Sequence, residues 1–288
     1  MYTEREVRVM HNEYFIDRMV THDDLIIVNK GEVAQHHDQA APHGRLFEIL
    51  GERNGRRIVR EISSNLVVVG GAITALENLT GATASWKPDT LNTIHGISAT
   101  GVGTPKLALF GIGTGGSGLE FGSVIAPTIK QKDILSPIPI RYGKSVTGDD
   151  SAKYFMKKDN GSGGTFSWYL KEFTGTPTIK SCWKNAVSED EDGTEILEDI
   201  STNPSEDGIE TFTEIQIDMN TKDGREYFES TGAIATARFN TIGFYVGAKN
   251  AENTEYGDVR LYSVVTFNSR DLSLATSSSF LYRIYSLI

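Results

Sequence analysis

The densest group of metal-ligand side chains lies near the N-terminal end of the sequence. His36, His37, Asp38 and His43 follow one another within a few positions. Imidazole nitrogens and a carboxylate suit zinc or a similar metal ion. Adjacent residues of an extended segment point to opposite sides, so His36 and His37 would not face one ion together. A polar loop with packing contacts is therefore the preferred interpretation, and a hydrolase with a metal at this loop is the alternative.

A second group, rich in carboxylate oxygens, lies in the acidic stretch 188–210. Asp190, Asp192 and Asp199 partly match a calcium-binding loop that would begin at Ser188. A full match has Asp at the first position and a bidentate Glu at the last. We expect no cofactor, with calcium as the open alternative. We interpret the stretch as a solvated acidic loop or as a docking patch for a basic partner.

The glycine-rich run 111–116, GIGTGG, contains the letters of a dinucleotide-binding fingerprint and follows a predicted strand. That fingerprint needs a helix directly after it, because the N-terminus of the helix holds the pyrophosphate. Residues 117–122 are poor helix formers, and Pro127 follows soon after. The run is better explained as a connection in which the backbone passes close to neighbouring backbone.

No complete set of acid, base and nucleophile is recognisable, and no serine lies in a Gly-x-Ser-x-Gly turn. We therefore expect a protein that is not an enzyme. The formal net charge of −10 disfavours nucleic acids and anionic membranes as partners, because both carry negative charge. Cys182 is the only cysteine, which excludes an intrachain disulfide and a cysteine-rich zinc site.

The pattern of apolar residues predicts a mainly β fold, with a sandwich or barrel-like core and a partly helical or extended N-terminal region. Side chains alternate between apolar and polar in several segments, and Gly, Asn, Asp and Ser turns separate them. We expect strands at residues 107–110, 166–171, 211–219, 239–246, 259–267 and 280–288.

The expected domain organisation is an N-terminal arm or small α+β region at residues 1–60 and a β-rich core at 61–288. A subdivision of the core near residue 150 is left open. Val7, Met10 and Tyr14 recur at helical spacing in the arm.

Residues 62–81 leave two alternatives open. Ser64 or Asn65 is a suitable cap for a helix that ends at Gly81. The valine run and the paired glycines favour a strand and turn instead.

Three stretches, residues 62–79, 107–141 and 237–285, resemble virion structural proteins of large tailed bacteriophages, particularly tail or baseplate components. The resemblance implies a chain in the virion, assembled in the host cytoplasm, with other virion structural proteins as partners in a homo- or hetero-oligomer. It transfers no catalytic residues.

Two other roles remain open: a capsid decoration, collar or neck protein, and a carbohydrate-binding module that recognises a receptor. Eight aromatic residues motivate the second role, although their spacing favours packing in the core. They are Phe239, Phe244, Tyr245, Tyr262, Phe267, Phe280, Tyr282 and Tyr285.

Overall fold

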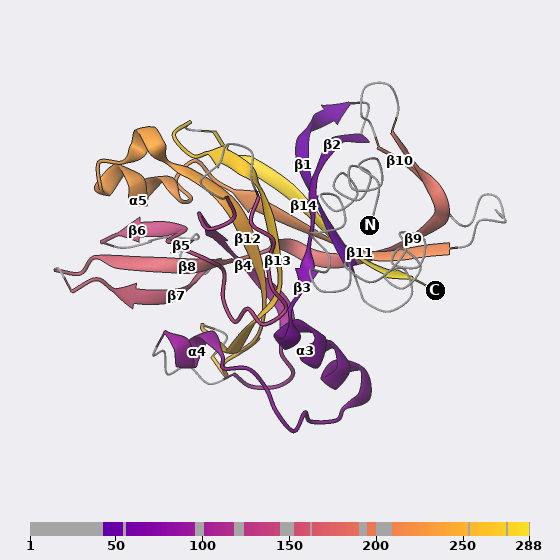
Figure 1. Cartoon of the computed structure of the whole chain (residues 1–288), viewed down its shortest axis with the longest axis horizontal. Helices are drawn as coiled ribbons and strands as arrows, with labels where there is room; N and C mark the ends of the chain where they lie inside the picture. The colour runs from indigo at the N-terminus through magenta and orange to yellow at the C-terminus, as the bar shows by residue number, and fades with distance from the viewer. Residues whose placement is uncertain are drawn as a thin grey trace, which may run out of the picture. The chain divides into compact units, whose positions relative to one another are not determined.

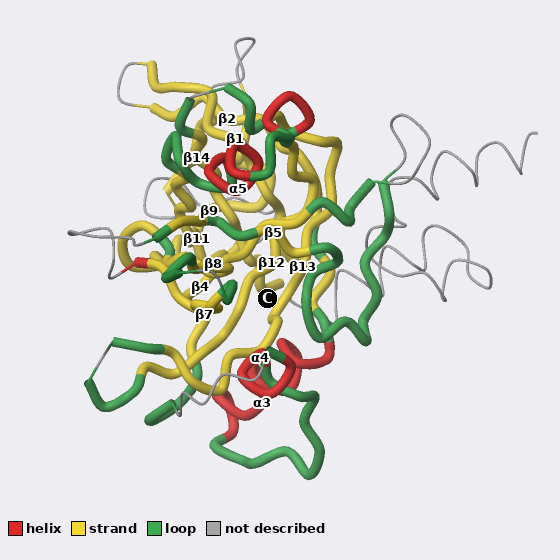
Figure 2. The backbone as a smooth tube through the Cα atoms, turned by 90° about the vertical axis from the view of Figure 1, so that its left-hand side faces the viewer, coloured by secondary structure: helices red, strands yellow, loops and turns green. Residues whose placement is uncertain are grey.

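The protein is mainly β, as its sequence predicts, and strands dominate the coloured parts of Figure 2. A computed structural model describes residues 43–53, 56–95, 101–117, 124–144, 153–161, 163–189, 195–199, 209–252, 254–274 and 276–287. The predicted helix around Val7 and Tyr14 lies outside these residues. No described helix has the length and apolar character needed to span a membrane.

The chain divides into two compact units. The described residues of the first lie within 1–66, 177–214 and 281–288, and those of the second within 67–176 and 215–280. The predicted domain boundary near residue 60 falls inside a strand.

One sheet has six strands in the order β10-β9-β11-β14-β1-β2 (Figure 1). The pairs β1–β2 and β9–β10 are antiparallel. The strands are β1 (His43–Arg53), β2 (Arg56–Ser64), β9 (Thr174–Glu189), β10 (Glu195–Asp199), β11 (Ile209–Met219) and β14 (Ser278–Leu287).

The second sheet has eight strands, with β3-β13-β12-β4-β8-β6 as its main path, β5 paired with β4, and β7 paired with β8. The pairs with a described register are antiparallel. The strands are β3 (Leu66–Val67), β4 (Lys106–Gly113), β5 (Pro137–Ile138), β6 (Arg141–Gly143), β7 (Tyr154–Asp159), β8 (Phe166–Glu172), β12 (Arg238–Lys249) and β13 (Tyr256–Asp271).

Helical segments are few and short in the described part of the chain. They are α3 (Val69–Thr80), α4 (Leu91–Ile94), α5 (Arg225–Ser230) and the 3-10 turn η2 (Ile234–Thr236).

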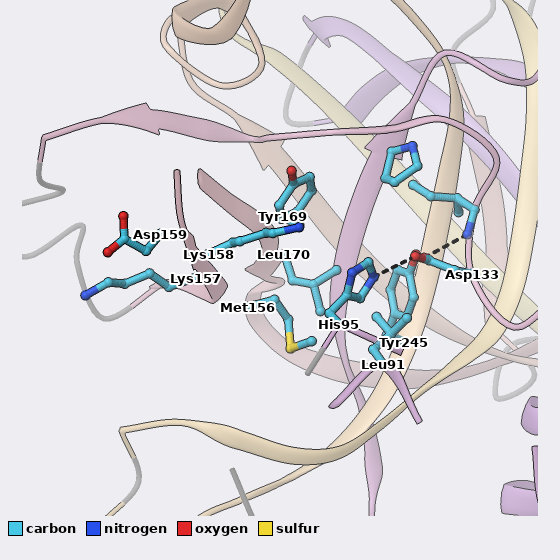
Figure 3. A pocket seen from close by; sticks show the side chains of 12 residues that line it. Leu91, His95, Asp133, Met156, Lys157, Lys158, Asp159, Tyr169, Leu170 and Tyr245 are labelled. Carbon is cyan, nitrogen blue, oxygen red and sulfur yellow. Dashed lines mark hydrogen bonds and ion pairs between the residues drawn. The ribbon is translucent and has the colours of Figure 1, made fainter. Parts of the chain in front are cut away.

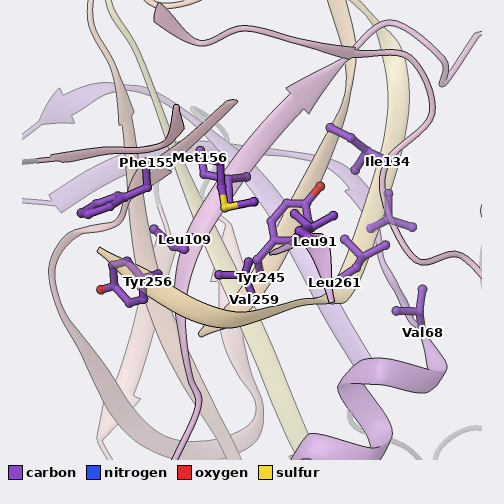
Figure 4. Packing of buried hydrophobic residues seen from close by; sticks show 12 residues of the cluster. Val68, Leu91, Leu109, Ile134, Phe155, Met156, Tyr245, Tyr256, Val259 and Leu261 are labelled. Carbon is purple, nitrogen blue, oxygen red and sulfur yellow. The ribbon is translucent and has the colours of Figure 1, made fainter. Parts of the chain in front are cut away.

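The strand predictions are confirmed, and burial explains why they succeeded. Ten consecutive residues of β12, from Phe239 to Ala248, are buried, so both of its faces are covered. Side chains from β12, β13, β4, β7 and β8 build the core of the second unit (Figure 4). This core includes Leu109, Phe155, Tyr245, Val259 and Leu261.

Residues 62–81 combine both of the alternatives that the sequence leaves open. β2 and β3 occupy the first part, and α3 begins at Val69 and ends at Gly81, which adopts the left-handed conformation with φ of 69°. The predicted caps Ser64 and Asn65 lie too early in the chain for this helix. The predicted end at Gly81 is confirmed.

The paired glycines bring α3 directly against the backbone of β13. A Cβ atom at Gly71 would lie 2.1 Å from the carbonyl oxygen of Tyr262, and one at Gly70 would lie 2.9 Å from that of Leu261. Only glycine permits this approach at Gly71, because the contacting atoms are main chain. At these two positions α3 therefore approaches main chain of β13, and Thr74 is the third residue that the helix buries.

The first half of the GIGTGG run, residues 111–113, is the end of strand β4, and only residues 114–116 form the predicted connection, with the predicted close approach to neighbouring backbone. Residues 114–117 form turns and a bridge rather than the start of a helix. A Cβ atom at Gly116 would lie 2.3 Å from the carbonyl oxygen of Asn240, and one at Gly113 would lie 2.7 Å from that of Leu135. Within the described residues 111–117, no helix starts at the position that a dinucleotide site requires.

An ion cluster with a buried centre, Glu214 and Arg283, and two partly exposed partners, Arg57 and Lys180, lies in the first unit. Arg283 donates from Nε (3.1 Å) and Nη2 (2.8 Å) to Oε2 of Glu214, while Arg57 (2.8 Å) and Lys180 (2.9 Å) donate to Oε1. Burial raises the pKa of the Glu214 carboxyl, but the hydrogen bonds and charges of Lys180 and Arg283 outweigh it and lower this pKa to about 2. Glu214 is thus ionised wherever the unit is folded near neutral pH.

Candidate functional site

The structure brings none of the predicted metal-ligand groups together within its described residues. His36, His37, Asp38, Asp190 and Asp192 lie outside them. His43 is the first residue of β1, and Asp199 is the last residue of β10.

The acidic stretch 188–210 is not simply the loop that its composition predicts. Residues 195–199 form β10, which pairs with β9 through Glu195 opposite Glu189 and Leu197 opposite Val187. Among the described residues, no three His, Cys, Asp or Glu side chains gather in a group that could hold a metal ion.

A different cluster surrounds a cavity of about 190 Å³ in the second unit (Figure 3). Its lining comes from α4, the segment before β5, and strands β7, β8 and β12. The lining side chains that carry polar groups are His95, Asp133, Lys157, Lys158, Asp159, Tyr169 and Tyr245.

Asp133 is the centre of the hydrogen bonds in this cavity. Its Oδ1 accepts from the hydroxyl of Tyr245 (2.7 Å) and from the backbone N–H of Ile134 (2.8 Å), and its Oδ2 lies 3.0 Å from Nε2 of His95. An ionised carboxylate can only accept hydrogen bonds, so His95 donates from Nε2. The second ring nitrogen of His95, Nδ1, lies on the side away from Asp133.

Tyr245 serves as a fixed donor in this network. Its burial, together with the nearby charge of Asp133, raises the pKa of its hydroxyl well above the usual value. The hydroxyl therefore keeps its proton, and Asp133 keeps this donor across the physiological pH range.

Contacts with its own helix, with β13 and with Tyr169 hold His95 in place. It directly follows α4, whose N-cap Thr90 accepts from the N–H of Thr93 (3.3 Å). Asn92, in the same helix, accepts from the N–H of Val259 on β13 (3.0 Å) and thereby ties α4 to the sheet. The His95 ring stacks on Tyr169 with 6.2 Å between centroids and an interplanar angle of 11°. The orientation of the imidazole is thus set from several sides.

The wall formed by β7 contains a strained residue. Met156 is buried and has φ of 56°, a left-handed conformation that costs a residue other than glycine roughly 1–3 kcal/mol. Figure 3 shows Met156 beside His95. It also shows that Lys158 extends toward Tyr169 and Leu170. Such strain persists only where the surroundings impose it, which makes this wall a candidate for function.

Sequence reasoning missed this site because its members are far apart in the chain. Asp133 is 38 positions from His95 and 112 from Tyr245. No motif joins them, and each residue alone is compatible with an ordinary core or surface position. Only the tertiary fold reveals the cluster.

A second candidate is an apolar outer surface on α3, which we define by Leu76, Leu79 and Trp86. Their side chains are 61%, 82% and 60% exposed. The loop after α3 returns along the helix, because Glu77 accepts from the N–H of Ala84 (2.8 Å) and from Nζ of Lys87 (2.7 Å). These two contacts tie the segment that carries Trp86 back to the helix.

The eight aromatic residues of the C-terminal third are buried, as their spacing predicts. They form ring pairs such as Phe239 with Phe267, 5.5 Å apart at their centroids and nearly perpendicular at 86°. They therefore do not form the exposed aromatic surface that motivated a carbohydrate-binding role. Tyr245 alone among them also lines the cavity.

Comparisons of the chain with protein families, with curated proteins and with solved structures find no match.

Proposed function

We propose that this chain is a non-enzymatic structural component of a tailed-phage virion, in the tail or baseplate, and that it acts by assembling with other subunits. One observation carries the proposal: Leu76 and Leu79 of α3, and Trp86 in the segment that Glu77 ties back to α3, are all exposed apolar side chains. Contiguous exposed apolar side chains mark interaction surfaces more often than single ones do. The resemblance of residues 62–79 to virion proteins includes most of this helix and supports the same role.

The charge distribution favours a second copy of this chain as the occupant of that surface. Two copies with a net charge of −10 repel one another, so they meet most easily where charge is absent. Between Val69 and Trp86 the sequence has one charged residue, Glu77, and Lys87 neutralises it. The α3 surface therefore offers a contact without like-charge repulsion.

A twofold contact follows from this choice. Two α3 helices that cross about a twofold axis bury the same residues on both subunits. Leu76 and Leu79 are three positions apart, so they lie on one side of the helix and meet their counterparts together. The inner side of α3 rests on β13 through glycine, which fixes the helix for such a contact.

Sedimentation velocity of the purified full-length chain over a range of concentrations tests this contact. We expect concentration-dependent association that the double substitution Leu76→Ser with Leu79→Ser weakens at least tenfold. The matched control is Leu274→Ser with Ile179→Ser, which removes two similarly exposed apolar side chains elsewhere. A wild-type chain that stays monomeric, or a control that weakens association equally, would contradict the proposal.

The place in the particle is tested separately on particles purified from the source lysate. Immunogold label at the distal tail, with the chain detected by mass spectrometry, supports a tail or baseplate part. Label over the head or neck, with hundreds of copies per particle, assigns it instead to a decoration, collar or neck role. Absence from the particles rules out a virion component.

A further inference from the structure

The cavity beside His95 has polar groups that no described residue uses, and this observation is independent of the proposed assembly role. Four of its charged side chains must be considered in turn. Asp133 accepts from three donors. Asp159 accepts from the N–H of Gly161 (2.8 Å) and points away from the cavity in Figure 3. The Asp133 carboxylate is therefore committed within the protein, and the Asp159 carboxylate faces away from the cavity.

The two lysines differ in the same way. Lys157 lies over the ring of Phe166, with Nζ 4.1 Å from its centroid, and points away from the cavity. Lys158 extends toward Tyr169 and Leu170, and its ammonium group makes no hydrogen bond or ion pair with any described residue. The ammonium group of Lys158 is thus the one charged group that extends into the cavity without a protein partner among the described residues.

His95 supplies the second available group. Nε2 is the ring nitrogen that donates to Asp133, and Figure 3 shows the other, Nδ1, on the side away from Asp133. In the tautomer with the proton on Nε2, Nδ1 is an acceptor. A ligand hydroxyl is the natural donor to such an atom.

Apart from Tyr169, whose ring stacks on His95, and Tyr245, whose hydroxyl donates to Asp133, the remaining walls are apolar and the space is small. Leu91, Ile134, Met156 and Leu170 line the cavity. An apolar cavity of about 150 Å³ accommodates a benzene ring, so about 190 Å³ accommodates one six-membered ring with small substituents. A sugar would leave most of its hydroxyls without partners against these walls, which is costly.

We propose that this cavity binds a ring-sized carboxylate that bears a hydroxyl group. Lys158 binds the carboxylate, Nδ1 of His95 accepts from the hydroxyl, and the apolar side chains contact the ring. The strained Met156 forms the wall between these two polar groups, and its flexible thioether side chain adapts to the ring.

Isothermal titration of the full-length chain with 3- and 4-hydroxybenzoate tests the proposal. We expect one of the two acids to bind more tightly than benzoate, and the neutral hydroxybenzamide of the same isomer to bind at least tenfold more weakly. Inorganic phosphate, which has charge but no ring, should not compete. If neither acid binds at millimolar concentration, if the amide binds as well as the acid, or if phosphate competes equally, the proposal is wrong.

Two neighbouring substitutions locate the charge. Lys158→Gln should weaken binding about tenfold or more, as expected for the loss of a charge-assisted hydrogen bond. Lys157→Gln makes the same chemical change one residue away, on the other side of β7, and should leave the affinity unchanged. Equal effects of the two would mean that only general charge attracts the acid, and would overturn the assignment.

His95→Phe tests the hydroxyl contact, since it keeps a ring on Tyr169 but removes the acceptor. In this variant the hydroxy acid should lose its advantage over benzoate, while benzoate itself still binds. A retained advantage would overturn the role given to His95.

Both lysine variants, Lys157→Gln and Lys158→Gln, alter exposed side chains, so their folding is not at risk.

Discussion

Glu214 and Asp133 are both carboxylates that accept hydrogen bonds from several donors, yet their surroundings differ. The Glu214 side chain is 6% exposed, and its partner Arg283 is fully buried between the rings of Phe47 and Phe212. The Asp133 side chain is 18% exposed, and its partner His95 is 28% exposed with one nitrogen left over. A sealed pair of this kind has no group left for a ligand, whereas the second pair presents one to a cavity.

The comparison separates stability from binding. In the first cluster the protein itself supplies the partners of the charges, so the cluster contributes to folding. In the second cluster the hydrogen bonds of Asp133 are all made by the protein. Lys158 and Nδ1 of His95 then remain able to contact a ligand. Buried ion pairs alone are therefore weak evidence for a site, and an uncommitted polar atom that faces a cavity is the more useful observation.

The largest expected effect is that of Glu214→Gln. It removes the negative charge that the buried guanidinium of Arg283 contacts, and breaking a buried ion pair from one side should lower the free energy of unfolding by about 3–5 kcal/mol. Urea unfolding followed by circular dichroism measures the change. The double variant Glu214→Leu with Arg283→Met should recover much of the loss, because a buried pair replaced as a whole is often neutral. A single variant as stable as wild type would show that the cluster is not sealed.

Lowering the pH should remove the stabilisation that Glu214 gives to the wild-type chain. The pKa of Glu214 is about 2 when folded and near 4.5 when unfolded, so its contribution is fully present above pH 4.5. As the pH falls from 4.5 toward 2, the unfolded chain binds the proton first and about 3 kcal/mol is lost. Unfolding free energies measured across this range should fall more steeply for wild type than for Glu214→Gln. Parallel slopes would contradict the assignment.

The smallest effect on the free energy of unfolding is expected for the partly exposed pair of His95 and Asp133. His95→Gln should change the free energy of unfolding by less than about 1 kcal/mol, because partly exposed ion pairs contribute little. Tyr245→Phe removes a buried donor to the same carboxylate and should cost more, about 1–3 kcal/mol. Thermal and urea unfolding of both variants checks the order. If His95→Gln is as costly as Glu214→Gln, the distinction between the two clusters fails.

The parts of the structure that sequence could predict are those in which burial acts locally. Strands such as 211–219 and 239–246 show their apolar pattern within a few positions, because each strand faces the core along its length. The helix at residues 69–80 was ambiguous, since Gly70 and Gly71 favour a turn until β13 is known to lie against them.

The candidate cavity could not be predicted in the same way. The groups that are dense in sequence, such as His36 and His37, attract attention because they are neighbours in the chain. His95, Asp133 and Lys158 are each isolated in sequence, and they meet only because α4, the segment before β5, and β7 surround one space. Their chemistry depends on which neighbouring groups are already committed, and that is a property of the tertiary structure alone.

The glycine contact beneath α3 affects which positions of this helix can tolerate substitution. Because main chain, rather than interlocking side chains, joins the inner side of the helix to β13, outward residues such as Leu76 and Leu79 can be replaced without repacking the interior. The contact that we propose for this surface can therefore be altered by substitution while the scaffold stays constant. Gly71 is the exception, because any larger residue there would displace the whole helix.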